Sequence, residues 1–432
     1  MGKNRDNAER LWDGDSTLAT EPWRMFLGLE EMTDGVAFIS SFSNVVAIAT
    51  DDGLVIVDTS SQLTGAGCVN ELDDWCAASG RARDVSTLVY THGHLDHVAS
   101  AEMFITPGRT RVVAHRAVKD RFDRYLMTRG YNGAINRRQF RVPGLEWPKS
   151  FRYPDVTFET GLELTVGGLP ISLRHDRGET DDHVWLWIED RKTLCTGDLF
   201  IWAAPNCGNP QKVQRYPRDW ALALRKMATL GAELLLPGHG PPIVGADRVR
   251  QALDETAQLL ETLVEQTLRW MNEGAPLDVV VQRVKAPAEL LARPYLRPVY
   301  DEPEFIVKNL WRLYGGWWDG DPSTLKPAPR SQLADELAEL CGGALELAKR
   351  ARDLSDADEH RLACHLAELA GLAAPHDRQV LALRAEVYRA RVKGETSLMA
   401  KSVFTAASEE PPNRGFSDGD ADPTFFTGRR GD

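Results

Sequence analysis

The sequence predicts a mixed α/β fold followed by an all-helical region. Between about Gly35 and Gly245, short β-rich runs such as "LVIVDTS", "STLVYTH" and "TLCTGD" recur between Gly, Pro and Asp residues, with helical stretches between some of them. From about Ala246 the strand-like runs stop, and apolar residues recur at helical spacing, as in "ADRVRQALDETAQLLETLVEQ". A chain of 432 residues with 43% apolar composition is long enough for more than one domain.

Charge and composition narrow the class of protein. The formal net charge of −12 is spread along the chain, so we expect no nucleic-acid partner and no attraction to an anionic membrane surface. The first residues are polar, and no stretch approaches the roughly 18 apolar residues that a membrane span requires. The six cysteines form no CxxC pair, which suits a reduced compartment. We therefore expect a cytoplasmic protein.

The segment "YTHGHLDHVA" concentrates ligand-type side chains directly after the strand-like run "STLVY". It holds His92, His94, Asp96 and His97, and imidazole and carboxylate groups bind divalent metals. In an HxHxDH arrangement the first two histidines suit one ion, while Asp96 and His97 suit a second. A two-metal site then needs three more ligands from elsewhere. The alternative is an exposed polar loop without a metal. Four ligand-type side chains in six positions make this alternative much less favoured.

Three later strand ends offer the missing ligands, in "LRHDRGETDDH", "TLCTGDLF" and "AELLLPGHGPP". With these motifs, and with Asp58 in "VIVDTS", the chain resembles the metallo-β-lactamase superfamily of hydrolases over roughly residues 35–245. The resemblance implies an αββα sandwich with the metals at one edge. It also implies that Asp198 is the bridging carboxylate and that His239 completes the site of the second ion.

One departure from the superfamily points to a branch. Most members have a histidine in "HxPGHT" as the third ligand of the first metal, whereas "HDRGETDDH" puts Glu179 in that place. A glutamate there resembles the alkylsulfatase branch. "YGGWWDGDPSTLKP" is also similar to that branch's "GWxDGxPxxL" connector, and the helices after it resemble its dimerisation domain. The resemblance then reaches to about residue 405.

These observations predict four segments along the chain. They are a catalytic domain over 20–245, a helical extension and aromatic connector over 246–330, a helical dimerisation domain over 331–405, and a disordered tail over 406–432, which is poor in apolar residues.

An anionic substrate would need side-chain cations, because a glutamate ligand lowers the positive charge of the site. The arginine that alkylsulfatases place after the bridging carboxylate has no clear counterpart, and the nearest cations are Lys212 and Arg215. Each is either an anion-binding group or a solvated surface cation. Asn136, in a predicted polar loop, either bonds an anionic oxygen or caps a helix or turn. His183 is either a partner of the ligands or proton donor, or an ordinary histidine at a strand edge.

The predicted function is that of a binuclear-metal hydrolase that cleaves sulfate esters, with a hydroxide bridging two divalent ions and Asp96 orienting this nucleophile. We expect zinc, with iron or manganese as alternatives. Two other hypotheses stay open. The same site could act on a lactone, thioester or phosphodiester, or the chain could be a non-catalytic dimeric scaffold. Attack at sulfur and attack at the ester carbon both remain open, as does the identity of a general acid.

The helices after residue 331 carry the prediction about assembly. Apolar residues stand at core spacing on three helices, but a three-helix unit of this size buries only a thin core. The residues are Leu333, Leu337, Leu340, Ala344 and Leu347, then Leu362, Leu366 and Leu369, then Val380, Leu383 and Val387. The resemblance implies that a second copy covers them, in a two-fold homodimer with an interface on the order of 2,000 Å² or more. An intrachain lid over the active site is the alternative.

Overall fold

The computed structural model describes residues 2–412, which fold into two compact units. The first unit comprises residues up to 137, residues 142–321 and residues 397–399. The second comprises residues 138–141, 322–396 and 400–412.

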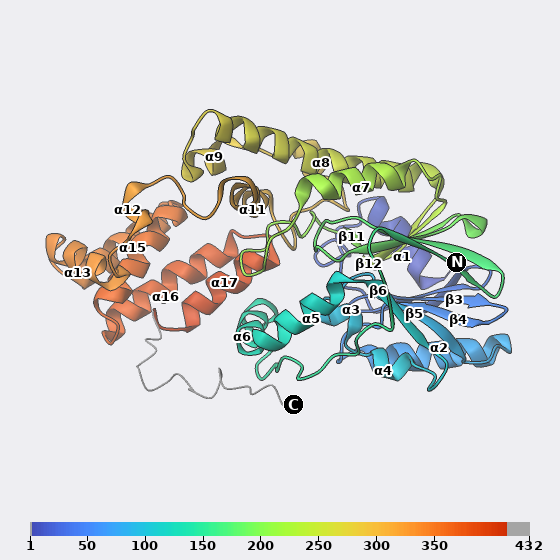
Figure 1. The fold of residues 1–432 in the computed structure, drawn as a ribbon. Helices are drawn as coiled ribbons and strands as arrows, with labels where there is room; N and C mark the ends of the chain where they lie inside the picture. Colours follow the sequence, from blue (N-terminus) through green and yellow to red (C-terminus); the bar gives the residue numbers. More distant parts are fainter. Residues whose placement is uncertain (1, 413–432) are drawn as a thin grey trace. The chain divides into compact units, whose positions relative to one another are not determined.

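Two β-sheets form the centre of the first unit (Figure 1). Within the described residues, the first sheet has the strand order β1-β2-β3-β4-β5-β6-β7 and the second the order β13-β12-β11-β10-β9-β8. The strands of the first sheet are β1 (Gly28–Thr33), β2 (Val36–Ser40), β3 (Val45–Thr50), β4 (Gly53–Val57), β5 (Val85–Val89), β6 (Arg111–His115) and β7 (Val156–Phe158). Those of the second are β8 (Gly161–Val166), β9 (Leu169–His175), β10 (Val184–Ile188), β11 (Thr193–Ile201), β12 (Leu234–His239) and β13 (Ile243–Val244).

Alternation along the strands explains why the sheets stack face to face. In β4, Val55 and Val57 join a buried cluster that also contains Leu186 of β10, so these residues point between the sheets. Leu54 and Ile56 join a different cluster on the outer face. Because successive strand side chains point to opposite faces, two apolar faces require cover on both sides of the sheet.

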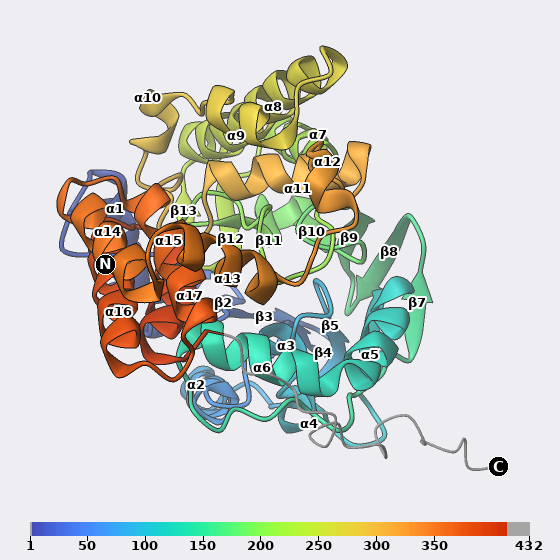
Figure 2. The same ribbon diagram turned by 90° about the vertical axis from the view of Figure 1, so that its left-hand side faces the viewer.

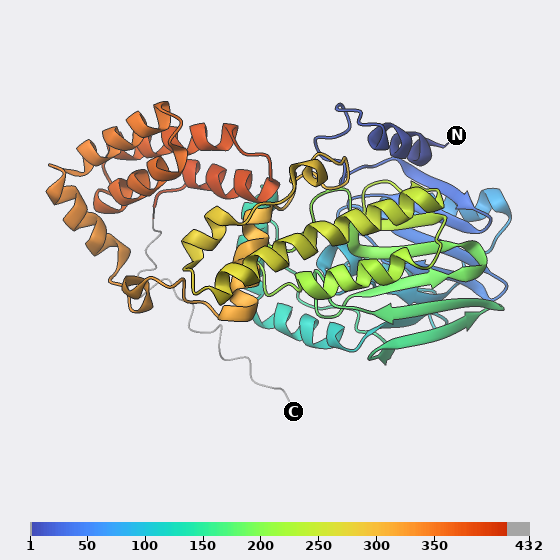
Figure 3. The same cartoon turned by 90° about the horizontal axis from the view of Figure 1, so that it is seen from above.

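Helices provide that cover and complete an αββα sandwich. Helices α2 (Gly65–Ser79), α4 (Ala101–Phe104) and α5 (Ala117–Met127) pack on the outer face of the first sheet, through Leu72, Phe104 and Phe122. Helices α7 (Pro217–Ala228), α8 (Ala246–Asn272) and α11 (Pro303–Gly315) share a core with the second sheet. Seen from above, α7 and α8 lie over that sheet (Figure 3). The predicted fold class is confirmed.

The segment boundaries differ from those predicted. Residues 246–321, predicted as part of a separate extension, belong to the first unit, because Leu260 of α8 and Leu310 of α11 lie in the same core as Trp220 of α7. Helices α9 (Leu277–Arg283) and α10 (Ala288–Leu291) lie in this segment. At the other end, α1 (Lys3–Trp12) buries Leu11 in that core, so the unit begins before residue 20. The second unit takes up the chain at residue 322, before the predicted 331.

Helices build the second unit (Figure 2). They are α12 (Pro322–Leu325), α13 (Arg330–Leu340), α14 (Ala344–Asp356), α15 (His360–Ala373), α16 (Arg378–Lys393) and α17 (Leu398–Glu409), which begins in the first unit. Leu347, Val380 and Leu383 are buried as predicted. Of the predicted tail, residues 406–409 lie in α17, and residues 413–432 lie outside the described part of the chain.

Three of the apolar residues predicted at core spacing are exposed in the single chain. Leu333, Leu340 and Leu362 are 53%, 81% and 50% exposed. On α13, which packs mainly against α15, the buried residues are instead Ala334 and Ala338. Small side chains let two helix backbones approach closely, so the alanines and not the leucines take the inner face.

Two further features bear on the sequence-based expectations. Among residues 2–412, no helix is both long enough and apolar enough to cross a membrane. All six cysteines are unpaired, and four of them are buried: Cys68, Cys76, Cys195 and Cys207.

Candidate metal centre

The histidine-rich loop follows β5 at the carboxyl edge of the first sheet, and Asp58 holds it there. Asp58 stands just after β4, which is parallel to β5, and has a positive φ of 59°. Its carboxylate accepts hydrogen bonds from the main-chain nitrogen and the hydroxyl of Thr91, both at 2.7 Å. It also accepts from Nδ1 of His97 at 2.7 Å, which leaves Nε2 of that histidine as the outward-facing ring nitrogen. Asp58 thus positions a ligand-type nitrogen without being one of the grouped residues.

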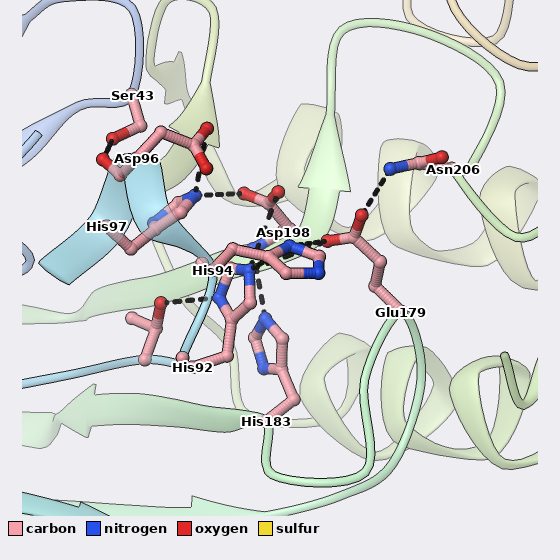
Figure 4. Close-up of polar contacts among 12 residues, drawn as sticks. Ser43, His92, His94, Asp96, His97, Glu179, His183, Asp198 and Asn206 are labelled. Atoms are coloured by element: carbon pink, nitrogen blue, oxygen red, sulfur yellow. Dashed lines mark hydrogen bonds and ion pairs between the residues drawn. The ribbon is translucent and has the colours of Figure 1, made fainter. Parts of the chain in front are cut away.

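Four side chains form the first group that could hold a metal ion: His92, His94, Glu179 and Asp198 (Figure 4). Oε2 of Glu179 lies 3.7 Å from Nε2 of His92 and 3.6 Å from Nδ1 of His94. His92 and Glu179 are 0% and 1% exposed. Helix α3 (Leu95–Val98) begins directly after His94, so the chain turns at this point and sends the next residues elsewhere.

Asp96, His97 and His239 form the second group. Oδ2 of Asp96 lies 3.4 Å from Nε2 of His239 and 3.8 Å from Nε2 of His97. Asp198 adjoins this group as well, with Oδ1 at 3.3 Å from His97 and Oδ2 at 3.4 Å from His239. Since Oδ2 is also 3.9 Å from Nε2 of His92, the Asp198 carboxylate lies between the two groups.

The donor atoms fit a divalent cation. Buried polar atoms normally have hydrogen-bond partners, yet Nε2 of His97, Oε2 of Glu179 and Oδ1 of Asp198 are buried without one. Oε2 of Glu179 faces His92 and His94, whereas Oδ1 of Asp198 and Nε2 of His97 face each other across the two groups at 3.3 Å. Nitrogen and carboxylate oxygen donors of this kind suit zinc, and the carboxylates also suit iron and manganese.

Burial and charge set the protonation of the histidines. Burial lowers the pKa of His92 and of His94, so both rings are neutral and have a lone pair to offer. Burial alone would also lower the pKa of His239, but the carboxylates of Asp198 and Asp96 outweigh it and raise this pKa to about 10. A divalent ion at His239 must therefore displace a proton, so its affinity falls as the pH falls.

His183 lies behind the ligand groups. Its Nε2 accepts a hydrogen bond from the main-chain nitrogen of Asp198 at 3.0 Å, and its ring stacks on His92 with centroids 4.9 Å apart. Burial lowers the pKa of His183 to about 3, so the ring is neutral at ordinary pH. The sequence left His183 as a partner of the ligands, a proton donor or an ordinary histidine at a strand edge, and this geometry favours the partner of the ligands.

The three residues predicted to bind substrate lie in two different settings. Nζ of Lys212 donates to Oδ1 of Asn136 at 2.9 Å. Burial and the neighbouring charge of Arg215 lower the pKa of Lys212 to about 7. Arg215 itself is 2% exposed and pairs with Glu179, with its NH1 2.6 Å from Oε1. Asn136 is on helix α6 (Arg129–Phe140), so the predicted polar loop is wrong.

Sequence reasoning missed several residues around the groups. Asn206, in the segment after β11, donates to Oε1 of Glu179. Trp23 and Phe42 lie against His239, with ring centroids at 6.5 and 5.7 Å, and Trp23 also packs on Tyr300 at 4.9 Å. These residues come from distant parts of the chain and carry no motif, so no local signal could have found them.

Comparison with known proteins identifies the family. Residues 40–239 match the model of the metallo-beta-lactamase superfamily, and residues 277–413 match that of the alkyl sulfatase dimerisation family. A linear primary-alkylsulfatase of Pseudomonas sp. (strain ATCC 19151) is 28% identical over 324 residues, which cover 68% of this chain and 60% of the relative. An (R)-specific secondary-alkylsulfatase of Pseudomonas sp. is 26% identical over 399 residues, or 85% of this chain and 60% of the relative.

The solved structures agree at the level of fold. That of a stereoselective inverting sec-alkylsulfatase from Pseudomonas sp. covers 97% of this chain with a TM-score of 0.81 and 22% identity, and 72% of that structure is covered in turn. The chain spans about 60% of the length of the two curated relatives. The families predicted from the sequence motifs are confirmed: residues 40–239 belong to the metallo-β-lactamase superfamily and residues 277–413 to the alkyl sulfatase dimerisation family.

Proposed function

We propose that the chain is a binuclear-metal hydrolase that cleaves sulfate esters, the reaction for which its alkylsulfatase relatives are named. The observation that carries the proposal is the pair of ligand groups on either side of the Asp198 carboxylate, because one carboxylate between two sets of donors suits two ions. The ligands proposed for the first ion are His92, His94 and Glu179, those for the second are Asp96, His97 and His239, and Asp198 serves both.

The metal identity and number belong to the proposal. We infer two ions, with zinc first and with iron or manganese next, because three of the seven proposed ligands are carboxylates. Ions at such a centre activate water near neutral pH and polarise the ester oxygen.

The side chains of this chain would orient the reactants. Asp96 is the most open of the proposed carboxylate ligands at 26% exposed, which suits it to align the attacking water. Lys212 and Asn136 are joined by a hydrogen bond near the first group, and a protonated Lys212 would bind a sulfate oxygen. Burial lowers the pKa of His94, and the charges of Arg215, Arg121 and, least of these, Lys212 lower it further, as expected if Lys212 lies within electrostatic reach of the first group.

One experiment tests the proposal directly. The purified full chain would be stripped of metal with a chelator, reloaded with zinc, iron(II) or manganese, and assayed on primary and secondary alkyl sulfates with metal content measured in parallel. We expect activity only after reloading, at two ions per chain. An active preparation with one ion or fewer would refute the binuclear site.

A second candidate keeps the site and changes the ester. Arg215 is engaged by Glu179, so it adds no cation for a sulfate group, and this favours an uncharged ester, such as a lactone or thioester, over an alkyl sulfate or a phosphodiester, which each carry one negative charge. The same assay decides, if these esters are included: turnover of them without turnover of alkyl sulfates would replace the first candidate. No turnover at full metal loading would favour a non-catalytic scaffold.

We also propose a homodimer that forms through the second unit. The match to the dimerisation family supports it, as do the exposed leucines Leu333, Leu340 and Leu362. Sedimentation of the full chain at micromolar concentration tests it, and a species of 48.1 kDa would refute it. A cytoplasmic location is likewise a proposal, supported by the unpaired cysteines, and fractionation of the source cells would test it.

A further inference from the structure

The two oxygens of the Glu179 carboxylate lie in different surroundings. Oε1 accepts from NH1 of Arg215, at 2.6 Å, and from the side-chain amide of Asn206. The same guanidinium nitrogen also donates to the main-chain oxygen of Glu179 at 2.9 Å. Oε2 is buried without a hydrogen-bond partner and faces His92 and His94. One oxygen is therefore tied back, and only the other is offered to the ligand group.

The side chain of Asn309 on helix α11 holds the main chain of Arg215 through hydrogen bonds. The main-chain nitrogen of Arg215 donates to Oδ1 of Asn309 at 3.2 Å, and its main-chain oxygen accepts from Nδ2 of Asn309 at 3.1 Å. The preceding residue, Gln214, donates to the same Asn309 side chain at 2.8 Å. With 2% exposure, the guanidinium is held in place, and moving it away would leave Glu179 charged, buried and unpaired.

Asn206 is held by the same region of the chain. Two residues after it, the main-chain nitrogen of Gly208 donates to the buried carboxylate of Asp301 at 2.6 Å. A Cβ atom at Gly208 would lie 2.2 Å from the main chain of Phe305 and Ile306, so the segment runs directly against α11. Both donors to Oε1 therefore come from one segment, between β11 and α7, that α11 anchors near its two ends.

The net charge of the Glu179–Arg215 ion pair explains why a buried arginine accompanies this glutamate. A buried glutamate adds a negative charge at the first metal position that a neutral ligand such as histidine would not add. A carboxylate and a guanidinium together carry no net charge, so the Glu179–Arg215 pair matches a histidine in charge while it offers a harder oxygen donor.

We propose that Arg215 is a positioning residue for the first metal position: with Asn206 it holds Oε1 of Glu179, presents Oε2 as a one-oxygen ligand and balances its charge. Arg215 is then not the group that binds the substrate anion, in contrast to the role suggested by the sequence. The inference rests on the metal centre of the proposed function and is independent of which ester is cleaved.

The test compares Arg215→Met and Arg215→Lys with Lys212→Met, which removes a neighbouring cation from the same segment. Affinity for each of the two ions is measured by competition with a chromophoric chelator, along with kcat and KM. Loss of a residue that orients a ligand weakens metal binding by about 10–100-fold. Arg215→Met should therefore weaken the affinity for the first ion by that factor and leave the affinity for the second ion within about threefold of the wild type. Arg215→Lys should recover part of the loss, because lysine keeps the charge without the planar fork.

The control should behave in the opposite way. Lys212→Met should bind both ions within about threefold of the wild type and raise KM for an anionic ester. If Arg215→Met instead keeps both affinities and raises KM as the control does, Arg215 binds substrate and the inference is overturned.

A second variant guards against a folding failure of Arg215→Met. Asn206→Ala removes only the amide donor to Oε1. It should lower the affinity for the same ion, by a smaller factor than Arg215→Met does. Unchanged affinity in Asn206→Ala overturns the shared role of the two donors. A wild-type chain that binds no ion overturns this inference together with the metal centre. A chain that binds two ions but does not cleave sulfate esters overturns the proposed substrate alone, and the affinity comparison still decides the role of Arg215.

Discussion

The buried ion pair between Asp182 and Arg121 gives a sharp test of how the histidine loop is held. Oδ2 of Asp182 accepts from Nε of Arg121 at 2.8 Å and from the main-chain nitrogen of Gly93 at 3.0 Å. Gly93 stands between His92 and His94, so this single oxygen joins the loop to α5. Burial opposes the ionisation of Asp182, but Arg121 outweighs it and keeps the pKa of the carboxyl below its usual value.

Asp182→Asn keeps the shape of the side chain and removes its charge. Breaking a buried pair costs about 3–5 kcal/mol, because the remaining charge stays buried, here on an arginine that is 2% exposed. Asp181 also contacts Arg121 but is 43% exposed, so it offsets little of the loss. Asp181→Asn is therefore the matched control, and it should cost less than about 1 kcal/mol.

Thermal unfolding of the metal-free protein measures the difference. At about 2 °C per kcal/mol for a unit of this size, Asp182→Asn should lower the Tm of the first unit by roughly 6–10 °C and Asp181→Asn by about 2 °C or less. A folded-state pKa below the usual value means that the pair stabilises the protein above about pH 4 and ceases to do so as the pH falls through that pKa. The gap between wild type and Asp182→Asn should therefore narrow below about pH 4. Equal shifts in the two variants at neutral pH would refute the reasoning.

Three other perturbations have defined outcomes. The pKa of Lys212 is lowered to about 7, so its protonated fraction falls as the pH rises through that value, and KM for an anionic ester should rise with it. Lys212→Arg should flatten this profile, because arginine stays charged, and an unchanged profile would exclude Lys212 as its cause. Gly93→Ala should weaken metal binding at least about tenfold by chelator competition, since its Cβ would lie 2.7 Å from Cδ of Arg121; full affinity would contradict this close packing. Arg384→Met should expose α17 to limited proteolysis, because the side chain is 5% exposed, pairs with a carboxylate of α15 at 2.8 Å and donates to main-chain oxygens at the end of α17. Cleavage no faster than in the exposed control Arg389→Met would argue against that anchor.

The ligand-type residues could be located from the sequence because their signals are local. His92, His94 and His97 fall within six positions after a strand, and Asp198 and His239 end or follow apolar runs that pair as neighbouring parallel strands. Parallel strands bring their carboxyl ends to one edge of a sheet, so residues far apart in sequence meet there without any knowledge of side-chain packing.

The surroundings of those residues could not be located in the same way. The helix that carries Asn136 was missed because it buries Asn132 and Asn136 as well as Ile135, so the apolar period that marks a helix is absent. Arg215 was recognised as a cation near the site, but a charge in sequence does not say which neighbour it meets. Its contact with Glu179 depends on α11, more than 90 residues further along the chain.

The role of α11 also changes how the helical half of the chain should be understood. The dimerisation family model begins at residue 277, yet residues up to 321 fold with the sandwich, and within them Asp301 and Asn309 anchor the segment that carries Asn206 and Arg215. A chain that ended where the strands end, near residue 245, would keep every proposed metal ligand and both donors to Glu179, but it would lose Asp301 and Asn309, which anchor the segment that carries those donors. The change from strands to helices in the sequence is therefore a boundary of secondary structure and not of the candidate metal centre, because Asp301 and Asn309, which lie among the residues that match the dimerisation family, anchor the segment that carries Asn206 and Arg215.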